Sequence, residues 1–78
     1  MKSTYFMEYD NFKNALKKAR IEQGLTQKVV AERLGVPQSF VSKYENGERR
    51  LDVVEFMTIA QALGIDPLHI LKAANLMC

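Results

Sequence analysis

Four polar residues near the middle of the chain recur at helical spacing, and their side chains could form hydrogen bonds with nucleic-acid bases. Gln38 carries an amide that donates and accepts together, which suits the N6/N7 edge of adenine. Ser39 and Ser42 carry short hydroxyls that can bond to bases or phosphates, and Lys43 can reach guanine O6/N7 or a phosphate. None of the four is acidic. Taken alone, the same residues also fit an ordinary solvated face of a helix.

Basic residues lie on both sides of this segment. Arg49 and Arg50 follow it and Lys28 precedes it, where cationic groups could contact phosphates or the minor groove of DNA. The alternative is a solvated basic turn. The net charge is only +2, but residues 1–50 hold ten Lys/Arg against six Asp/Glu, whereas residues 51–78 hold one against three. A basic front and an acidic back would orient the molecule against a polyanion.

Groups that would support catalysis or metal binding do not occur in a recognisable pattern. There is no nucleophile beside a general base, no convergent pair of carboxylates and no phosphate-binding glycine loop. His69 belongs to no cluster of metal ligands, so it is interpreted as a surface or interface residue. The single cysteine, Cys78, is either a reduced thiol at the chain end or an intermolecular bridge. The sequence therefore predicts no enzyme, no catalytic residue, no metal site and no cofactor.

Four glycines divide the chain into helical segments. Each follows a stretch with helical apolar spacing, where a left-handed residue is expected after the helix end. No stretch shows sustained strand alternation, so an all-α fold of five helices with short connections is predicted. The expected helices cover residues 11–23, 27–34, 38–46, 53–63 and 67–74, with Asp10 or Asn11 starting the first and Pro37 or Gln38 starting the third.

Three of these helices open with a capping signature. Thr26 is a good N-cap for the second helix, and Asp52 with Glu55 resembles a capping box for the fourth. Asp66 caps the fifth helix, with Pro67 in the first helical position. Apolar residues at helical spacing form the expected core: Phe12, Ala15, Leu16, Ala19, Val30, Ala31, Leu34, Val41, Tyr44, Val53, Phe56, Ile59, Ala60 and Leu63.

The length of 78 residues leaves room for one domain, expected over residues 11–78. Residues 1–10 contain aromatic side chains without a helical period. They are interpreted as an N-terminal tail laid over the domain or as an arm that reaches a partner subunit. No apolar run approaches the roughly 20 residues of a membrane span, and no signal peptide is evident. A cytoplasmic protein is therefore expected.

A run of motifs at uninterrupted spacing extends over most of the chain. It comprises Arg20, GLTQ at 24–27, Ala31, LGV at 34–36, VSKYENG at 41–47 and IAQALGIDP at 59–67. With this combination, the chain resembles the helix-turn-helix domain of the phage Cro/CI type, the XRE family, from about Phe12 to Leu71. Two positions depart from the family's pattern. Pro37 stands where a capping Ser or Thr is common, and Leu51 stands where proline is common.

The resemblance implies a compact five-helix domain of the lambda-repressor-like type with a helix-turn-helix core over residues 27–46. The helix over residues 38–46 would be the recognition helix, which lies in the major groove of DNA. Contacts with bases would come from Gln38, Ser39, Ser42 and Lys43. Contacts with the DNA backbone would come from Gln27, Lys28, Asn46, Arg49 and Arg50.

The resemblance also implies a structural role for Arg20 and Glu45. The matching positions in the family form a partly buried ion pair between the first helix and the end of the third. Phe40 has two interpretations: it packs beside Tyr44, or its ring faces the groove and touches a thymine methyl group.

The implied function is that of a sequence-specific transcriptional regulator, expected to be a repressor, that binds double-stranded DNA at a palindromic operator as a homodimer. The alternative is a restriction–modification controller or an antitoxin-like protein that also binds a partner protein. A protein-interaction module that has lost DNA binding is a further reading. Neither a membrane nor a small-molecule ligand is expected. The expected dimer interface comprises Leu68, Ile70, Leu71, Leu76 and Met77.

Overall fold

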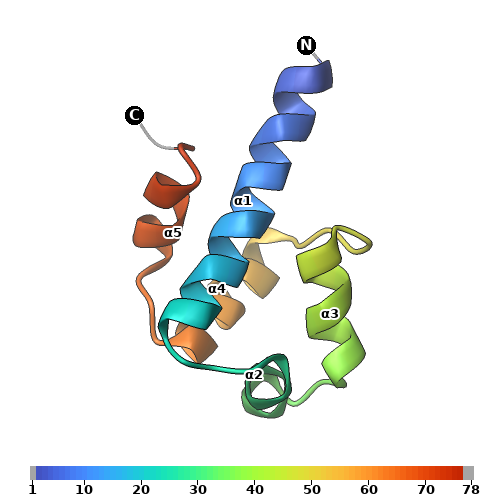
Figure 1. The fold of residues 1–78 in the computed structure, drawn as a ribbon, viewed down its shortest axis with the longest axis vertical. Coiled ribbons are helices and arrows are strands. Elements are labelled where there is room, and N and C mark those ends of the chain that lie inside the picture. Colours follow the sequence, from blue (N-terminus) through green and yellow to red (C-terminus); the bar gives the residue numbers. More distant parts are fainter. Residues whose placement is uncertain (1, 77–78) are drawn as a thin grey trace.

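Five α-helices joined by short turns form the structure, a computed structural model that describes residues 2–76 and the side chains of residues 7–76. They are α1 (Lys2–Glu22), α2 (Gln27–Leu34), α3 (Gln38–Asn46), α4 (Val53–Leu63) and α5 (Pro67–Ala73). Over the described range every regular element is a helix, which confirms the predicted all-α, five-helix fold. The long helix α1 runs between α3 on one side and α5 on the other, and α2 closes one end (Figure 1).

The helix ends follow the local signals of the sequence. The Thr26 hydroxyl accepts a hydrogen bond from the Val29 N–H at 3.1 Å. Asp52 and Glu55 form a complete capping box, in which each carboxylate accepts from the other residue's N–H, at 2.7 and 2.9 Å. Gly35, between α2 and α3, has a φ of 70°, a left-handed conformation that residues with a Cβ adopt only under strain. These predicted caps and the predicted turn are confirmed.

The core lies where the five helices meet. Phe12 of α1 and Phe56 of α4 contact each other edge to face, with ring centroids 5.0 Å apart. One expected core residue is wrong, because Val53 is 75% exposed. Leu51, in the loop before α4, packs against the core, and the buried face of α4 begins only at Phe56. The largest fully buried side chains are Leu16, Val30, Val41, Ile59, Leu63 and Ile70.

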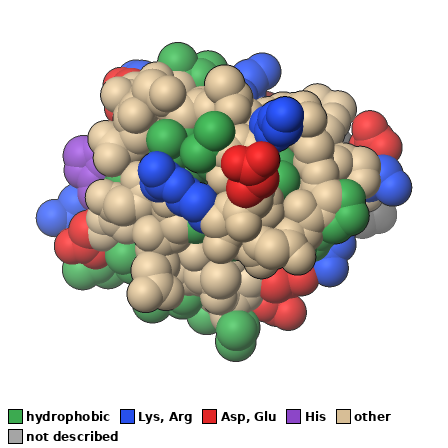
Figure 2. Space-filling model, turned by 90° about the horizontal axis from the view of Figure 1, so that it is seen from below, with side chains coloured by type: hydrophobic (Ala, Val, Ile, Leu, Met, Phe, Trp, Pro, Cys, Tyr) green, Lys and Arg blue, Asp and Glu red, His purple; other side chains and the backbone are tan. Residues whose placement is uncertain are grey.

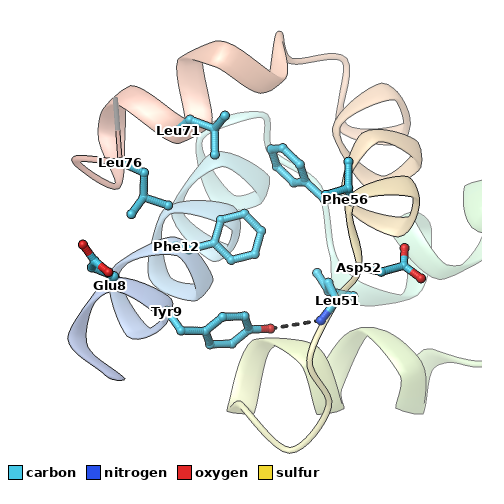
Figure 3. A pocket seen from close by; sticks show the side chains of 9 residues that line it. Glu8, Tyr9, Phe12, Leu51, Asp52, Phe56, Leu71 and Leu76 are labelled. Carbon is cyan, nitrogen blue, oxygen red and sulfur yellow. Dashed lines mark hydrogen bonds between the residues drawn. The ribbon is translucent and has the colours of Figure 1, made fainter. Parts of the chain in front are cut away.

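Helix α1 begins well before Asp10 or Asn11, so the expected start of the first helix is wrong. Tyr9 provides a physical reason. Its ring lies 5.6 Å from that of Phe12, between centroids, and its hydroxyl accepts a hydrogen bond from the Leu51 N–H at 3.2 Å (Figure 3). The residues before Asp10 therefore continue a helix that is attached to the loop preceding α4.

Two further features of residues 2–76 bear on function. No helix in this range has both the length and the apolar character needed to cross a bilayer. The same range contains no group of three or more His, Cys, Asp or Glu side chains placed to hold a metal ion. His69 is exposed.

Candidate nucleic-acid interface

Helices α2 and α3, with the turn at Gly35, form a helix-turn-helix unit. α2 packs closely against α3 and α4, and α3 also packs against α1. Within the turn, the Val36 N–H donates to the Ala31 carbonyl at 3.0 Å. Pro37 is the N-cap of α3 and provides no side-chain hydrogen bond, yet α3 begins at Gln38 as expected. Backbone bonds and packing, and not a polar cap, set the start of α3.

Helix α3 has a buried face and an outward polar face. Val41, Tyr44 and Glu45 are buried against the rest of the domain. The four candidate base contacts lie on the other side of the helix: Gln38, Ser39 and Lys43 are exposed, and Ser42 is half-buried. The structure therefore brings the four predicted residues together on one accessible side of α3, and their contacts with bases stay a prediction.

Gln27, the first residue of α2, connects the buried part of the unit to the first residue of α3. Its Nε2 donates to Glu45 Oε1 at 2.9 Å, and its Oε1 accepts a long hydrogen bond of 3.5 Å from Gln38 Nε2. This link was not predicted from the sequence, although a glutamine at the first position of each of two consecutive helices was a usable signal. The half-buried Gln27 amide thus lies between the scaffold and Gln38, and its expected phosphate contact stays a prediction.

The expected ion pair between Arg20 and Glu45 is present. Arg20 Nε lies 2.7 Å from Glu45 Oε2 and Nη2 lies 3.1 Å from Oε1, a bidentate arrangement. Arg20 Nη1 also donates to the Leu25 carbonyl at 2.8 Å. Burial, and then the neighbouring Glu45 carboxylate, raise the pKa of the Tyr44 phenol, so this hydroxyl stays protonated at neutral pH. The pair joins α1, the loop before α2 and the end of α3.

Three of the predicted backbone contacts lie at the surface. Lys28 is exposed near the start of α2, and Asn46 is exposed at the end of α3. Arg50 is exposed, and its guanidinium carbon lies 4.2 Å from the centroid of the Tyr9 ring, within cation–π distance. The structure thus places basic or polar groups at both ends of the helix-turn-helix unit.

Arg49 is engaged within the protein. Its Nη2 lies 2.7 Å from Glu55 Oε2, and its Nη1 donates at 3.1 Å both to Glu55 Oε1 and to the Arg50 carbonyl. These hydrogen bonds are the main cause of a lowered pKa at the Glu55 carboxyl group, with a further contribution from the Asp52 N–H. The sequence suggested a backbone contact for Arg49 and gave no sign of this carboxylate partner.

Phe40 packs inside the protein. Its ring meets that of Tyr44 edge to face, with centroids 5.8 Å apart, and its side chain is half-buried against the core. The Arg49 guanidinium carbon lies 4.7 Å from the centroid of the Phe40 ring. Of the two interpretations from the sequence, packing beside Tyr44 is the one observed.

The expected dimer residues fall into different environments. Ile70 is only 1% exposed and belongs to the core of the single chain, so its assignment to the interface is wrong. α5 packs against α1 and α4, and Ile70 is its fully buried residue, with Leu71 partly buried beside the core. Leu71 is half-buried, Leu68 and Leu76 are exposed, and Met77 lies outside the described residues.

A second exposed apolar surface was missed. Val53, Val54 and Met57 of α4 point away from the core and are each at least half exposed. They line a shallow groove of about 480 Å³. The nearly continuous apolar run of residues 53–60 was the available signal, because a helix that is apolar on both faces has more apolar surface than one core can cover. Leu71 and Leu76 line another apolar groove, with Phe12 and Phe56 (Figure 3).

Charged side chains do not gather into one dense patch at the α2 end of the molecule. Figure 2 views that end and shows Lys and Arg scattered among acidic, apolar and uncharged polar surface. Any attraction to a polyanion at this end therefore depends on the placement of individual basic groups and not on a strong overall field.

Comparison with known proteins gives a consistent set of similarities. The pattern of a helix-turn-helix family, HTH_3, matches residues 16–70. The chain is 37% identical over 56 residues to an uncharacterized HTH-type transcriptional regulator, y4dJ, of Sinorhizobium fredii, covering 72% of this chain and 73% of that protein. It is 39% identical over 51 residues to a propionyl-CoA carboxylase regulator of Cereibacter sphaeroides, covering 65% of this chain but only 11% of that protein.

Solved structures share the same arrangement of helices. An XRE-family-like protein from Pseudomonas syringae pv. tomato superimposes with a TM-score of 0.88 at 47% identity, covering 95% of this chain and 90% of that one. The restriction–modification controller protein C.AhdI from Aeromonas hydrophila gives a TM-score of 0.72 at 31% identity, covering 80% of this chain and 94% of that one. The lambda-repressor-like fold expected from the sequence is confirmed.

Proposed function

Because the chain belongs to the Cro/CI-type (XRE) helix-turn-helix family and is a DNA-binding transcriptional regulator of that non-enzymatic family, we propose that it represses transcription by binding a palindromic operator as a homodimer. The observation that carries the proposal is the two-sided character of α3. Its inner residues are fixed in the core and by the Arg20–Glu45 pair, and its outer residues are polar and accessible. A rigid helix with a free polar side is what reading of base edges in the major groove requires.

The proposed contacts divide by position on this unit. Gln38, Ser39, Ser42 and Lys43 face the bases from α3, with Gln38 held near Gln27. Backbone contacts come from the two ends of the unit, at the start of α2 and after α3. They comprise Gln27, Lys28, Asn46 and Arg50, whereas the Arg49 side chain is paired with Glu55.

A homodimer follows from the small reach of one recognition helix. Two-fold pairing places two such helices about 34 Å apart, one turn of DNA, so that both halves of a palindrome are read. Exposed apolar side chains support a second copy as the partner, because isolated soluble domains rarely leave such surfaces uncovered. The proposed interface keeps Leu68, Leu71 and Leu76 and adds Val53, Val54 and Met57 of α4.

Selection of duplex DNA from a random library tests the proposed function directly. We expect enrichment of one palindromic site, with log K falling steeply as log salt rises because bound phosphates release counterions. Sedimentation of the protein–DNA complex should give two chains per site. If no site is enriched and binding does not respond to salt, the protein does not act as a sequence-specific DNA binder.

Substitution of Gln38 by alanine should change specificity more than general affinity. Loss of one bidentate base contact is expected to relax the preference at one position of each half-site by about 1–3 kcal/mol. By contrast, Arg50→Ala, which removes a proposed phosphate contact, should weaken binding to all sequences alike. Titration of a set of single-base operator variants with both proteins separates the two effects. If Gln38→Ala instead weakens binding to every operator variant equally, Gln38 does not contact a base.

A restriction–modification controller is the second candidate function. The structural similarity to the restriction–modification controller protein C.AhdI, which extends over 94% of that chain, favours this function. An antitoxin-like role is grouped with this candidate, because in both cases the main role of the chain would include binding a partner protein. Isolation of the complex from source cells and inspection of the neighbouring genes tests it: a stoichiometric partner protein favours the antitoxin-like role, and an adjacent endonuclease–methyltransferase pair favours the controller.

A further inference from the structure

The Arg49 side chain lies between the recognition helix and α4. Its guanidinium group contacts the Phe40 ring of α3 on one side, 4.7 Å from the ring centroid to the guanidinium carbon. On the other side it makes two hydrogen bonds with the Glu55 carboxylate of α4, at 2.7 and 3.1 Å. A planar guanidinium group suits both contacts at once, since it can stack on an aromatic ring and pair with a carboxylate in its own plane.

The backbones of α3 and α4 pack less closely on each other than on the other helices they contact. α3 packs closely on α1 and α2, and α4 packs closely on α2 and α5, so direct contact between α3 and α4 depends mainly on side chains. Phe40 lines a groove together with Val54, Thr58 and Ile59 of α4, which places its ring at this junction. Arg49 covers that ring from the loop between the two helices.

The anchor for Arg49 is itself held in place. Glu55 Oε1 accepts a hydrogen bond from the Asp52 N–H at 2.9 Å, as part of the capping box of α4. The Arg49 N–H donates to the Lys43 carbonyl at 3.3 Å, which attaches the same residue to the end of α3. Both the backbone and the side chain of Arg49 are therefore bound to elements on either side of the junction.

We propose that Arg49 is a positioning residue, which holds the recognition helix at its angle through Phe40 and Glu55, and that it is not a phosphate contact. The inference rests on the proposed function, because positioning of α3 matters only if α3 reads DNA. Phe40 follows Gln38 and Ser39 in the first turns of α3, so a shift of its ring moves the residues proposed to face the bases.

The two possible roles of Arg49 predict opposite effects for Glu55→Gln. Glutamine still completes the capping box of α4, so this change chiefly removes the charge that holds Arg49. If Arg49 binds a phosphate, Glu55 competes with DNA, and Glu55→Gln should tighten binding to every sequence. If Arg49 positions α3, Glu55→Gln should lower the ratio of specific to non-specific affinity.

The experiment measures operator and non-specific DNA affinity for the wild type, Arg49→Gln, Glu55→Gln and the double variant, which restores the wild-type net charge. The operator used is the palindromic site that selection from the random DNA library enriches. We expect each of the three variants to lose roughly two- to thirtyfold in the specific-to-non-specific ratio, with the double variant no worse than either single one. The salt slope of the double variant should equal that of the wild type.

Two results would overturn the inference: an unchanged or higher ratio of specific to non-specific affinity in Glu55→Gln, or a double variant whose salt slope falls by about 0.9, the value of one lost phosphate contact. Arg50→Gln is the matched control, which should weaken both kinds of DNA alike. All variants are compared at a temperature where circular dichroism shows that they have the helix content of the wild type. If Arg49→Gln does not have that helix content, Arg49→Lys is used in its place. A wild-type protein that selects no site overturns the proposed function itself, and this inference with it.

Discussion

Replacement of Arg20 by alanine is expected to lower the free energy of unfolding by about 3–5 kcal/mol, because it leaves the buried Glu45 carboxylate without its cationic partner, with the uncharged Gln27 amide as its remaining donor. Only 2% of the Glu45 side chain and 12% of the Arg20 side chain are exposed, so water cannot replace the lost bonds. The loss is comparable with the whole stability of a small domain, about 5 kcal/mol. DNA binding should therefore disappear through unfolding.

Urea denaturation followed by circular dichroism measures this loss. Lys17→Ala, at an exposed position of the same helix, is the control and should change stability by less than about 0.5 kcal/mol. An osmolyte that restores folding of Arg20→Ala should also restore operator binding. A folded Arg20→Ala protein that still fails to bind would instead place Arg20 among the DNA contacts.

Substitution of Ile70 by alanine is expected to cost about 2–5 kcal/mol of unfolding free energy, since it opens a cavity in the core. The side chain is 1% exposed within a single chain, beside a core that includes Leu16 and Leu63. A residue of the dimer interface would behave differently, because its loss would weaken association and leave the isolated chain nearly as stable.

Thermal melts of Ile70→Ala at several protein concentrations distinguish the two roles. A core residue gives the same decrease in Tm at every concentration, whereas an interface residue gives a decrease that grows on dilution. Leu68→Ala, on the exposed side of the same helix, is the comparison and should leave the stability of the monomer nearly unchanged. A destabilisation of Ile70→Ala that vanishes at high concentration would return Ile70 to the interface.

The polar side of α3 could be predicted because it depends on the helical period and on residue type alone. Once α3 was expected over residues 38–46, the burial of Val41 and Tyr44 followed, and with it the outward placement of Gln38 and Lys43. The Arg20–Glu45 pair was accessible only through the family resemblance, since no local pattern connects residues 25 positions apart. What each outward side chain binds stays a proposal.

Errors in the prediction came where a distant residue decided the outcome. The N-terminal part of α1 was expected to be a tail or an arm because its aromatic residues lack a period, yet α1 begins at Lys2 and the Tyr9 hydroxyl accepts a hydrogen bond from the Leu51 N–H. Val53 has the spacing of a core residue, but Leu51 packs there from outside the helix. Nothing in the sequence indicated that the Arg49 guanidinium group pairs with the Glu55 carboxylate, and its expected contact with DNA stays a prediction that the Glu55→Gln experiment tests.

The sequence by itself determined the five helices, their caps and the helix-turn-helix unit, because N-cap bonds, left-handed glycines and apolar periodicity act within a few residues of one another. Only the tertiary structure decided which apolar side chains the core covers and which polar ones it engages. Ile70, expected at an interface, is buried in the core, and Val53, expected in the core, is exposed. Arg49, expected at the DNA backbone, pairs with Glu55. Such choices depend on helix packing between distant segments, which no short stretch of sequence specifies.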